Sequence, residues 1–74
     1  MNEVKELFEA IGKSDVDANQ TGLLDNGIID SLDMLALIRE IEKKYGMLAA
    51  KFIEAENFES FETIAKMIKD AYGK

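Results

Sequence analysis

The chain has 74 residues with no cysteine and no histidine, and its 15 acidic and 9 basic side chains give a formal net charge of −6. The length indicates a single domain, residues 1–74, and the absent residue types exclude disulfides, thiolate metal sites and catalytic centres built on a histidine. The acidic balance argues against nucleic acid or an anionic membrane surface as a partner. Since no apolar run could cross a bilayer and no signal-peptide pattern is visible, we expect a cytoplasmic protein that does not insert into membranes. We also expect it to be a monomer.

Apolar residues recur at the spacing of amphipathic helices in three stretches, and no alternating strand pattern competes with them. The three helices are expected at residues 3–12, 31–45 and 61–72. Ser60 is the expected N-cap of the last helix, because serine side chains commonly accept hydrogen bonds from the first turn. Glycines are expected to end the three helices: Gly12, Gly46 and Gly73. The predicted fold class is therefore all-α.

A fourth, short helix is expected at residues 54–58, which makes the prediction a small four-helix bundle. Three apolar residues around this helix are expected to add volume to the core: Phe52, Ile53 and Phe58. The connection over residues 13–30 is long for such a small bundle, and loops of this length are usually functional or disordered. Its apolar side chains are expected to pin it across the helices: Val16, Leu23, Leu24, Ile28 and Ile29.

One serine stands where this loop meets the second helix, within the sequence Asp30-Ser31-Leu32-Asp33. Asp30 can act as the N-cap, and Asp33 stands where a capping box places its acid, so Ser31 is expected on the first helical turn, pointing outward. The unpaired N–H groups and partial positive charge of a helix start favour a phosphate attached to Ser31 or bound near it. Without a histidine to activate it, Ser31 is better interpreted as a residue to be modified than as a catalyst.

Residues 24–33, Leu-Asp-Asn-Gly-Ile-Ile-Asp-Ser-Leu-Asp, closely resemble the attachment site of acyl carrier proteins, and the resemblance extends over essentially the whole chain. It implies a non-catalytic carrier and phosphoprotein, in which Ser31 bears a 4′-phosphopantetheine arm and is presented by Asp30 and Leu32. The arm would hold an acyl or aminoacyl cargo as a thioester. The loop over residues 26–30 is more similar to D-alanyl and other free-standing aminoacyl or peptidyl-type carriers than to fatty-acid carriers.

The resemblance also implies partners: a phosphopantetheinyl transferase, a loading ligase and downstream enzymes of fatty-acid or secondary-metabolite biosynthesis. Leu32 and Leu35 fall outside the expected core stripe of the second helix, on the side that carries Ser31. The implied docking face consists of Asp33, Leu35, Ala36, Arg39 and Glu42. The helix departs from the fatty-acid carriers because it is neutral overall, with three acidic residues (Asp33, Glu40, Glu42) against three basic ones (Arg39, Lys43, Lys44).

A calcium site is one alternative function. Asp15, Asp17 and Asn19 reproduce the first three ligand positions of an EF-hand loop, directly after an amphipathic helix. Gln20 stands where that loop needs a glycine for its sharp turn, and Asn26 stands where it needs a bidentate glutamate. Weak divalent binding to a polar loop is therefore a stronger expectation than a calcium-sensor site, a solvated acidic loop is a stronger expectation still, and no metal ligand is assigned.

A helical protein-interaction module is the second alternative. Such a module would use the exposed leucines of the second helix, Leu32 and Leu35, without a prosthetic group. Single exposed apolar residues are common on protein surfaces, so these two leucines do not distinguish the module from the carrier. Both alternatives predict that Ser31 stays unmodified.

Overall fold

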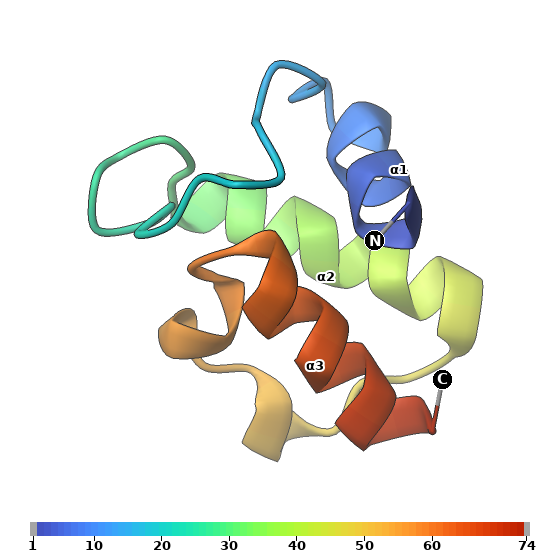
Figure 1. Ribbon diagram of the computed structural model, residues 1–74. Helices are drawn as coiled ribbons and strands as arrows, with labels where there is room; N and C mark the ends of the chain where they lie inside the picture. The colour runs from blue at the N-terminus through green and yellow to red at the C-terminus, as the bar shows by residue number, and fades with distance from the viewer. Residues whose placement is uncertain (1, 74) are drawn as a thin grey trace.

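The only regular secondary structure that the computed structural model describes over residues 2–73 is helical. Between these limits there are three α-helices, α1 (Asn2–Ala10), α2 (Ser31–Tyr45) and α3 (Phe61–Tyr72), and two short 3-10 helices, η1 (Ala50–Phe52) and η2 (Ala55–Phe58). Helix α1 contacts both α2 and α3, and η2 packs against α3 (Figure 1). The prediction of an all-α fold is confirmed. None of the described helices has the length and apolar character needed to span a bilayer.

The helix ends follow local capping signals. Both α2 and α3 begin and end where the sequence predicts, and Ser60 accepts a hydrogen bond from the Thr63 N–H as N-cap of α3. Helix α1 stops at Ala10, two residues before the expected end, because the chain tightens into a turn in which the Lys13 N–H donates to the Phe8 carbonyl. Gly12 takes the left-handed conformation that this turn requires, with φ of 79°.

The core is built from the apolar faces of the three α-helices, with Phe8 stacked on Phe61 at a ring-centroid distance of 4.6 Å. Phe58 is fully buried and Phe52 half-buried, as expected. The prediction for Ile53 is wrong, since 38% of it is exposed. It follows η1, an unpredicted 3-10 turn that directs Phe52 rather than Ile53 toward the core.

The connection over residues 11–30 lies on the helices rather than away from them. Val16, Leu23 and Ile29 are buried, and Leu24 and Ile28 pack against the core as partly buried residues. The expectation that these apolar side chains pin the loop across the bundle is confirmed. The loop therefore approaches α2 along a defined path.

The carboxyl ends of α2 and α3 are joined by aromatic residues. Tyr45 stacks on Tyr72 at 5.3 Å between ring centroids, and the Tyr72 hydroxyl donates a hydrogen bond of 2.9 Å to the Gly46 carbonyl. Burial, together with the nearby Glu42 carboxylate, raises the pKa of Tyr72 above its ordinary value. The hydroxyl therefore stays protonated at neutral pH and keeps its donor role.

Candidate functional site

Ser31 is the first residue of α2 and is exposed. Its position matches the expectation of a serine on the first turn, at the point where the long loop becomes a helix. An exposed hydroxyl at this position is accessible to a modifying enzyme, and the backbone N–H groups of the helix start give the surroundings a partial positive charge.

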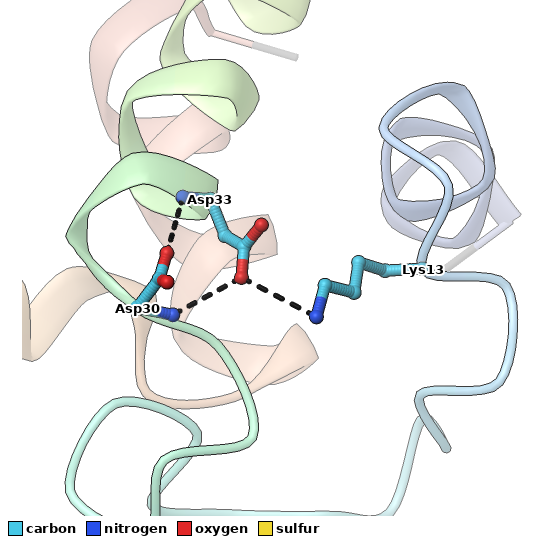
Figure 2. A network of polar contacts seen from close by, with 3 residues as sticks. All are labelled: Lys13, Asp30 and Asp33. Carbon is cyan, nitrogen blue, oxygen red and sulfur yellow. Dashed lines mark hydrogen bonds and ion pairs between the residues drawn. The ribbon is translucent and has the colours of Figure 1, made fainter.

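The residues on either side of Ser31 form a complete capping box (Figure 2). The Asp33 N–H donates to Asp30 Oδ1 at 2.9 Å, and the Asp30 N–H donates to Asp33 Oδ2 at 3.1 Å. The hydrogen bond from the Asp33 backbone is the main reason that the pKa of Asp30 lies below its ordinary value. The capping box expected from Asp30 and Asp33 is confirmed, and it fixes the backbone that presents Ser31.

Lys13 contacts this capping box, although it lies at the opposite end of the long loop in sequence. It follows the turn that ends α1, and its Nζ lies 3.5 Å from Asp33 Oδ2, with both side chains partly exposed (Figure 2). Asp33 is therefore shared between the start of α2 and the end of α1. Sequence reasoning missed Lys13, because no local pattern links residues twenty positions apart.

Glu59 is a second residue that sequence reasoning missed. Its carbonyl accepts a hydrogen bond of 2.9 Å from the Leu23 N–H, and its Oε1 accepts from the N–H groups of Leu24 at 3.0 Å and Asp25 at 3.4 Å. The Leu23 carbonyl in turn accepts from the Ile29 N–H at 3.0 Å. Glu59, the residue just before the N-cap of α3, thus binds the loop that leads into Ser31.

The outer side of α2 begins with two exposed leucines. Leu32 is 73% exposed and Leu35 55% exposed, and Arg39 is exposed one turn further along the helix. These three residues form what we call the outer face of α2. The outer face of α2 thus combines two apolar side chains with one positive charge, on a chain whose net charge is −6.

The other residues of the expected docking face are less available. Ala36 is half-buried, and Asp33 is engaged in the capping box. Glu42 is half-buried, and its Oε2 accepts a hydrogen bond of 2.9 Å from the Leu48 N–H just after α2. This bond ties the chain after α2 to the helix. The structure therefore brings together Leu32, Leu35 and Arg39 as an accessible set and gives Asp33 and Glu42 internal partners.

The acidic loop after α1 is closed by its own side chains. Asp17 Oδ1 accepts from the Asn19 N–H at 2.9 Å, and the Asp17 N–H donates to Gln20 Oε1 at 2.7 Å, while Asp15 is exposed nearby in sequence. Over residues 2–73 no three histidine, cysteine, aspartate or glutamate side chains are grouped so that they could hold a metal ion. Gln20 stabilises the turn at the position where an EF-hand loop needs glycine.

The exposed Ser31 and its capping box thus lie at the start of α2, and the outer face runs from there along the first nine residues of the helix. Comparison of the chain with protein-family models, with curated proteins and with solved structures finds no match.

Proposed function

We propose that the protein is an acyl or aminoacyl carrier whose cargo is held as a thioester on a 4′-phosphopantetheine arm at Ser31, and that its helices form the bundle of the acyl carrier family. The observation that carries this proposal is the exposed Ser31 on the first turn of α2, framed by the Asp30–Asp33 capping box. In this proposal the chain is a cytoplasmic monomer and a substrate of its partner enzymes.

The surroundings of Ser31 fit a phosphate ester. The first turn of a helix offers N–H groups and a partial positive charge, which favour an attached phosphate. The backbone at this turn is fixed by hydrogen bonds on both sides of Ser31, while the residue itself is exposed. A rigid backbone with an accessible hydroxyl is what a modifying enzyme needs in order to position its acceptor.

Attachment would be carried out by a separate phosphopantetheinyl transferase with coenzyme A as donor. The Ser31 Oγ would attack the phosphorus that bears pantetheine, forming one P–O bond. The P–O bond to the adenosine half of the diphosphate would break, and adenosine 3′,5′-bisphosphate would leave with the bonding electrons. The hydroxyl proton would pass to a base of the transferase, since this chain has no histidine. Once attached, the arm supplies a thiol for thioester formation, and the tether raises the local concentration of cargo at each partner.

Intact-mass measurement tests the proposal. After incubation with coenzyme A and a broad-specificity transferase, the wild-type chain is expected to gain one arm and Ser31→Ala none. The control variant Ser14→Ala removes another exposed serine of the same chain and is expected to gain one arm. An unchanged wild-type mass, or a modified Ser31→Ala chain, would contradict the proposal. An unmodified chain is the result that both the calcium site and the protein-interaction module predict.

The outer face of α2 is the proposed docking surface for the loading ligase. Leu35→Ala is expected to lower the loading rate about fivefold or more, because an anchoring side chain in a small interface contributes on the order of 1 kcal/mol or more. Met47→Ala is the matched control, since Met47 is 88% exposed but lies beyond the carboxyl end of α2. Its loading rate is expected to stay unchanged.

Charge on the same surface is tested with Arg39→Glu. The reversal is expected to impair the cognate ligase while leaving unharmed, or improving, recognition by enzymes that dock on an acidic helix. The measurement is the loading rate with both kinds of enzyme. Equal rates for wild type, Leu35→Ala and Arg39→Glu throughout would show that the outer face of α2 does not select partners.

A further inference from the structure

The turn that presents Ser31 is already rich in negative charge. Asp30 and Asp33 stand on either side of Ser31, and a phosphodiester on Ser31 would add another negative charge to the same turn. One helical turn rises about 5.4 Å, which is less than the screening length of about 8 Å at physiological ionic strength. The three charges would therefore repel one another with little screening from salt.

Lys13 is the cation that the structure brings to this turn. Its Nζ lies 3.5 Å from Asp33 Oδ2, the same oxygen that accepts the Asp30 N–H. Hydrogen bonds from the Asp33 and Leu32 backbones and from the Asp33 side chain lower the pKa of Asp30, and the Lys13 charge adds a smaller contribution in the same direction. The ammonium group thus acts on both carboxylates that flank Ser31.

We propose that Lys13 is a positioning residue of the modification site, which holds Asp33 in the capping box and offsets the negative charge that the arm adds to Ser31. This inference rests on the proposed function. Lys13 stabilises the modified chain more than the unmodified one, because its charge has an additional partner nearby once the phosphodiester is attached. By linkage, the modified turn also strengthens the contact between the end of α1 and the start of α2.

Lys44 provides a matched control on the same pair of helices. Its Nζ lies 3.3 Å from Glu6 Oε1, so it also joins α2 to α1, and its side chain is 39% exposed against 35% for Lys13. It lies thirteen residues along α2 from Ser31, a distance of about 20 Å at the helical rise. Its charge is therefore screened from the modification site.

The test compares urea unfolding of the unmodified and the modified chain for wild type, Lys13→Gln, Lys13→Arg and Lys44→Gln. In the unmodified chain, Lys13→Gln is expected to raise the unfolding equilibrium constant by up to about fivefold, as for a partly exposed ion pair. In the modified chain the increase is expected to be about two- to fivefold larger again. Lys13→Arg should match wild type in both forms, and Lys44→Gln should have the same effect in both.

Salt provides a readout that a purely structural role would not change. The additional effect in the modified chain is expected to vanish at about 1 M salt, where the screening length falls to about 3 Å. If wild type accepts the arm and Lys13→Gln destabilises both forms equally, the inference is wrong while the proposed function stands. If wild type never accepts the arm, the proposed function fails, and the role of Lys13 fails with it.

Discussion

Replacing Glu59 with alanine is expected to lower the free energy of unfolding by about 2–3 kcal/mol, because a carboxylate that accepts backbone hydrogen bonds contributes more than a neutral acceptor. The substitution removes the acceptor of the 3.0 Å bond from the Leu24 N–H and of the longer bond from Asp25. These N–H groups belong to the loop that leads into Ser31. We therefore also expect slower modification of Ser31, measured as the rate of arm transfer at equal transferase concentration.

Two variants separate the effect of the hydrogen bonds to Glu59 from general effects of charge. Glu59→Gln keeps an amide oxygen as acceptor and is expected to lose less stability than Glu59→Ala. Glu56→Ala removes an exposed carboxylate three residues earlier and is expected to change stability by less than about 0.5 kcal/mol. Equal losses for Glu56→Ala and Glu59→Ala would show that the hydrogen bonds to the loop contribute nothing.

Phe58→Ala is expected to lower the free energy of unfolding by about 3–5 kcal/mol, the usual cost of truncating a fully buried phenylalanine. A domain of this size is commonly stable by only about 4–11 kcal/mol, so the variant should be near its unfolding threshold. The expected fall in Tm is at least about 12 °C, measured by thermal circular dichroism.

Ile53→Ala is the informative comparison for Phe58→Ala. Ile53 lies five residues earlier, between η1 and η2, and is 38% exposed. Truncating it removes less buried surface than truncating the fully buried Phe58, so we expect a smaller loss, of about 1 kcal/mol. Similar losses for the two variants would mean that Ile53 is a core residue after all and that the segment between α2 and α3 packs differently.

The parts of the fold that the sequence predicts correctly depend on interactions close in sequence. Helix α2 begins after Asp30 and ends at Gly46 as expected, because the capping box joins residues three apart and the glycine takes a positive φ. Ser60 and Gly73 delimit α3 in the same way. Exposure of Leu32 and Leu35 likewise follows from helical periodicity alone.

The parts that the sequence does not predict depend on contacts between distant segments. The role of Glu59 is not visible in the sequence, since its partner Leu24 lies 35 positions away. The contact of Lys13 with Asp33 likewise appears only when the loop is folded. Ile53 was misplaced because a 3-10 turn, which has a different periodicity from an α-helix, precedes it.

Fragmentation mass spectrometry of the wild-type chain, after incubation with coenzyme A and a phosphopantetheinyl transferase, tests most directly whether Ser31 carries the arm. The proposed function predicts a single adduct with the mass of phosphopantetheine, and fragment ions that place it on Ser31 rather than on Ser14 or Ser60. An adduct on another residue, or a chain without an adduct under conditions in which a known carrier is fully converted, would contradict it.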